Sequence, residues 1–151
     1  MKRLLLLLII PILSYSQTYD DIMNMTSEKN FKITMIDNDY RKITEQSDDL
    51  MIVYGLDYEK IGNDKISFEK MGYYIKSSDR DMFMIVTDKT DYKTITESIK
   101  RDCEFTDILD LGVGDYLCYK CTQSKYNGMV GYSVTEIGGT IVRIIPKPKE
   151  E

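Results

Sequence analysis

The chain of 151 residues contains no histidine and no tryptophan, and it has only three prolines and three cysteines. Without histidine it cannot build a Ser-His-Asp triad, a Cys-His dyad or a histidine-containing metal site. The formal charge of −5 argues against nucleic acid as a partner, because such binding needs a basic face that neutralises phosphates. These absences exclude several classes of function but indicate no particular activity.

The first sixteen residues have the pattern of a secretory signal peptide. Two basic residues precede an apolar run from Leu4 to Leu13, and small residues lie at positions −3 and −1 of a cut before Gln17. The run is too short for a helix that crosses about 30 Å of hydrocarbon, so no stable membrane span is expected after its removal. A buried N-terminal helix is the alternative, but it leaves the basic start and the small-residue end unexplained.

We therefore expect residues 1–16 to be removed and the protein to be exported, either to the periplasm or out of the cell. The removal would take the formal charge from −5 to −7, because Lys2 and Arg3 leave with the leader. Two of the three prolines stand at 146 and 148, and none lies between 17 and 145. Residues 17–145 thus read as a single α+β domain and 146–151 as a charged C-terminal tail.

Periodicity and turn signals divide this domain into two helices and eight strands. The segment 27–38 favours a helix capped by Thr26 or Ser27, although Phe31, Ile33 and Met35 also alternate as in a strand. The second helix has Thr90 as its expected N-cap, and Gly62-Asn63-Asp64 is a turn signal. The expected helices are 27–38 and 91–102, and the expected strands are 40–46, 50–58, 66–77, 82–87, 105–109, 115–123, 128–136 and 140–145.

This order predicts an α+β fold in which two helices pack on one face of an antiparallel sheet. Each half carries a Gly-Tyr pair in its third strand, Gly72-Tyr73 and Gly131-Tyr132, which would fit a tandem helix-plus-four-strand arrangement. Chance hairpin chemistry explains the similarity equally well. The order resembles cystatin-like and beta-lactamase-inhibitor-protein-like units, and this is a likeness of element order only.

Several segments together resemble a family of small secreted flavobacterial proteins. The likeness covers most of the chain after the leader and rests on Met23 to Ser27, Phe31-Lys32, Asp37 to Tyr40, Asp115 to Cys121, Ser124 to Gly128 and Gly131 to Glu136. The resemblance implies a secreted protein of defined fold and favours the helix at 27–38. It carries no catalytic residues to transfer.

Three cysteines in an exported chain predict one disulfide and one remaining thiol. Cys118 and Cys121 spell C-x-x-C, but a redox motif of that type opens a helix, where its thiol pKa is lowered. Here the two cysteines lie in an alternating β-run, on opposite faces and about 10 Å apart, beyond the reach of a disulfide. A zinc site lacks its remaining ligands, and we expect no metal or cofactor.

The hairpin geometry suggests which cysteines pair. If the turn centres on Gly112-Val113, Cys103 lies beside Thr122 and close to Cys121, whereas Cys118 faces Asp107. We therefore predict a disulfide between Cys103 and Cys121. A slip of the register would favour Cys118 instead.

The eleven tyrosines after the leader offer the remaining candidates for a site. Because neighbouring strand residues face opposite sides, one of Tyr73 and Tyr74 must point away from the core, and the same holds for Tyr116 against Tyr119. We nominate Tyr73, Tyr74, Tyr116 and Tyr132 as ligand-binding residues on a sheet face. Ordinary cross-strand aromatic packing is the alternative.

The function expected from these features is a non-enzymatic binding or interaction module whose partner is an unidentified protein or small ligand. The rival hypotheses are a carboxylate-based hydrolase of envelope polymers or glycans and an inhibitor-like protein. Any of the 25 acidic residues could serve a hydrolase, so none is nominated as catalytic. A deep pocket with two carboxylates about 5–10 Å apart would favour the hydrolase.

Overall fold

The computed structural model describes residues 17–57, 59–61, 65–67, 70–122, 128–135 and 138–148, with 59–61 and 65–67 described by their backbone alone. The predicted leader, the predicted turn at 62–64 and the last residues of the tail lie outside this part of the chain.

The described residues form three α-helices, one short 3-10 helix and ten strands. The helices are α1 (Tyr19–Asn24), α2 (Glu28–Asp37), η1 (Thr44–Gln46) and α3 (Lys89–Asp102). The strands are β1 (Arg41–Lys42), β2 (Met51–Leu56), β3 (Glu59–Ile61), β4 (Lys65–Ser67), β5 (Lys70–Lys76), β6 (Arg80–Asp88), β7 (Cys103–Asp110), β8 (Asp115–Cys121), β9 (Met129–Val134) and β10 (Gly138–Pro146).

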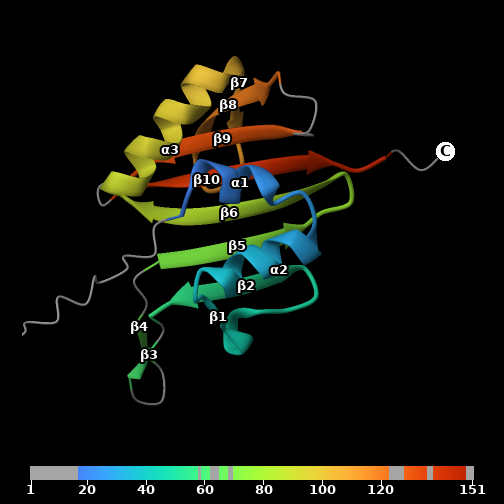
Figure 1. Ribbon diagram of the computed structural model, residues 1–151. Coiled ribbons are helices and arrows are strands. Elements are labelled where there is room, and N and C mark those ends of the chain that lie inside the picture. Colours follow the sequence, from blue (N-terminus) through green and yellow to red (C-terminus); the bar gives the residue numbers. More distant parts are fainter. Residues whose placement is uncertain are drawn as a thin grey trace, which may run out of the picture.

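Eight of these strands make one antiparallel sheet in the order β1-β2-β5-β6-β10-β9-β8-β7, and β3 pairs with β4 in a separate two-stranded sheet. The centre of the large sheet is the pair of β6 and β10, whose register runs from Asp88 opposite Gly138 to Arg80 opposite Pro146. These two strands are the longest in the sheet. Figure 1 shows the three α-helices on the same side of the sheet.

The prediction of an α+β fold with two helices packed on one face is wrong. The chain is richer in β-structure, since a single eight-stranded sheet dominates the described residues and the helices are few and short. Three helices, not two, lie on the sheet. The additional helix, α1, forms because Thr18 and Asp21 make a capping box that satisfies the first free N–H groups of a six-residue segment.

The other two helices begin where short polar side chains cap them. Ser27 accepts a hydrogen bond from the N–H of Asn30 at the start of α2. At α3 the cap is Asp88, which accepts from the N–H groups of Thr90 and Asp91, so the prediction that Thr90 caps this helix is wrong. A carboxylate at this position also complements the positive end of the helix dipole.

The helices bury one face of the sheet, which we call the helix face. Its core joins residues of all three helices to alternate residues of the strands. Two glycines let the helices come close: a Cβ at Gly72 would lie 2.5 Å from Sδ of Met35 on α2, and one at Gly139 would overlap the ring of Tyr92 on α3. A larger residue at either position would meet these side chains, so glycine lets α2 and α3 pack close to the sheet.

The opposite face of the sheet, which we call the second face, has an apolar core of its own. Its buried centre consists of Met84, Tyr116, Cys118, Val142 and Ile144, and Leu109 and Leu111 at the end of β7 pack against it. A neighbouring cluster joins Ile43, Val53 and Met71. Strands β7 and β8, at the top of Figure 1, turn behind β9, so the sheet covers part of its own second face.

A disulfide joins Cys103 to Cys121, which confirms the predicted pairing. The two residues are directly opposite each other in the β7–β8 register, and Cys118 is opposite Asp107, as expected. The pairs Cys103–Cys121 and Asp107–Cys118 belong to different registers, and they occur together because the register shifts between Phe105 and Asp107. This β-bulge, which the sequence analysis missed, moves Cys103 by one position, from beside Thr122 to a place opposite Cys121.

An ion-pair cluster, in which Lys70 and Asp91 are buried and Asp88 is exposed, fixes the start of α3 to the sheet. The Nζ atom of Lys70 lies 2.7 Å from a carboxylate oxygen of Asp91 and 3.0 Å from one of Asp88. Burial opposes the charge of Lys70, but the hydrogen bonds to Asp91 and Asp88 outweigh it and raise the pKa of the lysine above 10.5. Strand β5 and helix α3 are thereby held together at their ends.

We predict that removing the disulfide with the double variant C103S/C121S lowers the free energy of unfolding by about 3 kcal/mol, since the bond closes a loop of 18 residues. Urea denaturation of the oxidised protein and of the variant measures the difference. Non-reducing peptide mapping should find the cross-link between these two cysteines. A cross-link from Cys118 to either of them would contradict the register.

We predict that Lys70→Met destabilises the protein by about 3–5 kcal/mol, because it removes the cation that lies 2.7 Å from the buried carboxylate of Asp91. The matched control is Lys76→Met at the exposed end of the same strand, where the change should stay within about 0.5 kcal/mol. Urea denaturation at neutral pH measures both effects. Equal losses in the two variants would show that the buried cluster contributes nothing.

The same cluster predicts a loss of stability at alkaline pH. A lysine whose pKa is raised by folding stabilises the native state fully below its unfolded value of 10.5, and this contribution disappears as the pH rises through the higher folded value. The half-buried Tyr73 and the buried Tyr74, whose pKa values are also raised by desolvation, add a loss of stability that the Lys70→Met variant retains. The stability difference between the wild type and this variant should therefore shrink above pH 10.5.

Candidate functional site on the second face of the sheet

A cavity of about 340 Å³ lies on the second face, and we call it the inner cavity. Residues of five strands and of the β7–β8 turn line it: Met51, Tyr73, Ile75, Met84, Val86, Val113, Tyr116 and Thr140. Val113 in the turn and Tyr116 on β8 come from one end of the sheet and Met51 on β2 from near the other. They meet because the sheet is curved.

The strand sequences explain why this cavity is apolar. In β6, Met84 and Val86 point to the second face, while Phe83 and Ile85 join the helix-face core. A strand whose two sets of alternate residues are both apolar is expected to be covered on both faces. The centre of the second face is covered by Leu109 and Leu111, and the inner cavity is one of the parts that remain open.

Among the described residues, the side-chain polar groups of the inner cavity are three hydroxyls. The hydroxyl of Tyr73 donates to Sδ of Met71 at 2.9 Å, and the hydroxyls of Tyr116 and Thr140 line the same cavity. Burial raises the pKa of both tyrosines, so both phenols are neutral at physiological pH. Of the described residues that line the cavity, none is charged.

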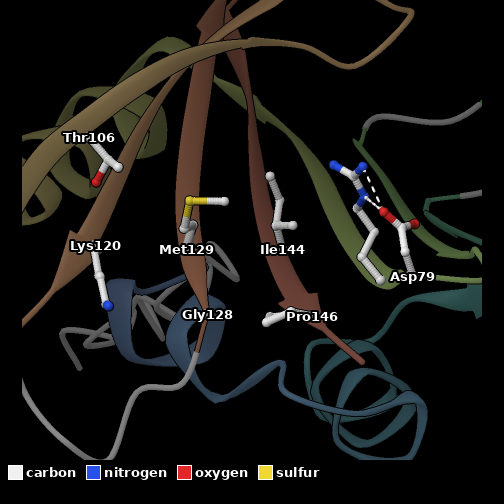
Figure 2. Close-up of a pocket in the computed structure, with 8 residues that line it drawn as sticks. Asp79, Thr106, Lys120, Gly128, Met129, Ile144 and Pro146 are labelled. Carbon is white, nitrogen blue, oxygen red and sulfur yellow. Dashed lines mark hydrogen bonds and ion pairs between the residues drawn. The ribbon is translucent and has the colours of Figure 1, made fainter. Parts of the chain in front are cut away.

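A second cavity of about 450 Å³, which we call the outer cavity, lies nearer the other end of the same strands. Figure 2 shows Asp79 on one side of it, Thr106 and Lys120 on the other, and the apolar side chains of Met129 and Ile144 between them. Asp79 is ion-paired with Arg80 at 2.8 Å. This cavity thus combines an apolar floor with a charged rim.

The carboxylates nearest these cavities do not have the properties of a glycosidase pair. Asp79 and Asp110 line the same small cavity of about 240 Å³, but hydrogen bonds from Arg80 and Ser77 hold the pKa of Asp79 below its usual value. A general acid needs a raised pKa. Asp110 accepts the N–H of Gly112 at 2.8 Å and so shapes the turn.

The structure brings two of the four nominated tyrosines together. Tyr73 and Tyr116 both line the inner cavity. Tyr74 and Tyr132 lie on the helix face, where each is 5% exposed. Tyr74 stacks on Phe83 with ring centroids 5.1 Å apart, and the hydroxyl of Tyr132 lies 2.9 Å from that of Tyr119.

The sequence analysis did not nominate the aliphatic and methionine residues that make up most of the inner cavity. A signal for them existed in the apolar run Met82 to Val86 and in the run Ile141 to Ile145, where Arg143 is the one polar residue, since such runs indicate burial on both faces. What the runs could not show is that the second face would retain an unfilled space.

Comparison with known proteins found no match among protein-family models, curated proteins or solved structures. Within the described residues, no helix is long and apolar enough to cross a membrane, and no group of three or more Cys, Asp or Glu side chains is placed to hold a metal ion.

The remaining thiol, Cys118, lies in the second-face core and is fully buried. Burial raises its pKa, and its sulfur lies so close to Gly131 that a Cβ there would be 2.8 Å away. Cys118 and Cys121 thus occupy opposite faces of β8, as their spacing predicted, and belong to different cores.

We predict that Cys118 is unreactive in the native protein. Ellman's reagent should detect almost no thiol before unfolding and one thiol per chain in guanidinium chloride without reductant. The Cys118→Ala variant should give no signal in either condition. Rapid reaction of the native thiol would contradict the packing of the second face.

Proposed function

We propose that this chain is an exported, non-enzymatic binding protein whose inner cavity takes a small, uncharged and largely apolar molecule. The observation that carries the proposal is the composition of the cavity wall, which consists of apolar side chains with three hydroxyls and no charged residue among those described. Of the four tyrosines predicted to bind a ligand, Tyr73 and Tyr116 line this cavity, and we propose them as ligand-binding residues.

The size and polarity of the cavity support a small molecule. Its volume of about 340 Å³ lies at the lower end of the range for ligand sites, about 300–1,000 Å³. The hydroxyls of Tyr73, Tyr116 and Thr140 can exchange hydrogen bonds with a carbonyl or hydroxyl group of the ligand. An ionised ligand would lose its hydration without gaining a counter-ion, at a cost of several kcal/mol.

The chemistry of the cavity supports binding over catalysis. Neither tyrosine is activated as a base or nucleophile, because burial raises the pKa of both. The ionised Asp79 lines the outer cavity with Arg80 and does not line the inner one. A binding role requires only the shape and polarity that are present.

An exported location accounts for two features that have no common explanation in the cytosol. The disulfide between Cys103 and Cys121 is of a kind that persists in oxidising compartments, and residues 1–16 have the pattern of a leader. The resemblance to small secreted flavobacterial proteins supports the same location, in the periplasm or outside the cell.

We predict that the protein binds N-phenyl-1-naphthylamine, an uncharged fluorescent probe, and that Val86→Phe weakens this binding by about tenfold or more, equal to about 1.4 kcal/mol. The larger ring would occupy the inner cavity, which Val86 lines. The matched control is Val134→Phe, at a valine on β9 that is 73% exposed and outside the cavity. Fluorescence titration measures the affinities, and circular dichroism melting verifies that both variants fold.

Equal affinities of the two variants for the probe would contradict binding in the inner cavity. The anionic analogue 1-anilinonaphthalene-8-sulfonate tests the polarity of the site and should bind the wild type more weakly than the uncharged probe. Tighter binding of the anion would contradict the proposal and direct attention to the basic groups of the outer cavity.

A further inference from the structure

In the full chain, which still carries residues 1–16, Gln17 is one of the most deeply buried polar residues, at 3% exposure. Within the described part of the chain, neither its amide oxygen nor its amide nitrogen has a hydrogen-bond partner. A buried polar group without a partner is destabilising, and a protein rarely retains one without a reason.

We infer that Gln17 is a modification site, whose side chain cyclises onto the new α-amine after leader removal to give an N-terminal pyroglutamate. This inference rests on the proposed export, because the α-amine of Gln17 exists only when residues 1–16 have been removed.

The reaction needs no co-reactant. The unprotonated α-amine of Gln17 attacks Cδ of its own side chain, a C–N bond forms in a five-membered lactam, and the bond from Cδ to the amide nitrogen breaks. The proton that the amine gives up leaves with that nitrogen as ammonia. The reacting groups belong to one residue, so the step is intramolecular, and an α-amine with a pKa of about 8 is partly unprotonated at neutral pH.

The lactam suits the buried position better than an open N-terminal glutamine. An open residue would place an ammonium group next to a buried amide, and burial of a charge is costly unless it is paired. Cyclisation removes that charge together with the two N–H donors of the side-chain amide. Only the lactam N–H, the lactam carbonyl oxygen and the backbone carbonyl oxygen of residue 17 then need hydrogen-bond partners.

The segment that follows holds the first residue in place. The backbone N–H of Thr18 donates to Oδ2 of Asp21 at 2.9 Å, and the Thr18 hydroxyl accepts the N–H of Asp21 at 3.2 Å. These bonds start α1, whose Ile22 and Met23 are buried in the helix-face core. Cyclisation of residue 17 leaves the N–H of Thr18 intact, so the capping box and the lactam are compatible.

The test is the intact mass of the protein purified after export from cells that carry the full chain. We expect a chain that begins at residue 17, lighter than the open form by one ammonia in addition to the two hydrogens lost in the disulfide. Edman sequencing should be blocked. Because the lactam is buried, pyroglutamyl aminopeptidase should remove it from unfolded protein but not from native protein.

The matched control is Gln17→Asn, which keeps an amide but would require a strained four-membered ring to cyclise. This variant should begin at the same position with a free amine and melt at a lower temperature than the wild type. A wild-type chain that begins at Gln17 with its full mass would overturn the cyclisation and leave the proposed export standing. A chain that retains residues 1–16, or begins elsewhere, would overturn both.

Discussion

The pairing of β6 with β10 is the constraint on which the rest of the structure depends. These strands join in nine register positions, from Asp88 opposite Gly138 to Arg80 opposite Pro146, and so unite the strands on either side into one sheet. Because each strand is apolar on both sides, the pair needs cover on both faces. The helices supply it on one face, and the curvature of the sheet supplies it on the other.

The apolar residues on the two faces of the sheet are covered by different parts of the chain. On the helix face, glycines in β5 and β10 let Met35 and Tyr92 approach closely, and aromatic rings fill the space between helices and strands. Arg143 is fully buried there and donates to the carbonyl of Met129 at 2.9 Å. The three described α-helices all lie on that face. On the second face, Leu109 and Leu111 of the β7–β8 hairpin pack against the core, and residues of the hairpin line both the inner and the outer cavity.

The hairpin therefore links the disulfide to the proposed binding site. Its two strands are joined by the Cys103–Cys121 bond at one end, and its turn places Val113 in the wall of the inner cavity at the other. The bulge near Thr106 lies between them and adjusts the register so that both ends fit. A local irregularity of one residue thus places Cys103 directly opposite Cys121 without changing the register next to the turn.

By itself the sequence determined much of the local structure: the second and third helices within about two residues, the opposite facing of Cys118 and Cys121, the disulfide, and the exclusion of histidine chemistry. Only the tertiary structure decided that α1 packs into the helix-face core, that Tyr74 and Tyr132 are core residues while Tyr73 and Tyr116 line a cavity, and that the inner cavity exists at all. The physical reason is that alternation along a strand shows which residues share a face, because it depends on local backbone geometry. Whether that face is covered depends on the curvature of the whole sheet and on contacts between strands far apart in the chain.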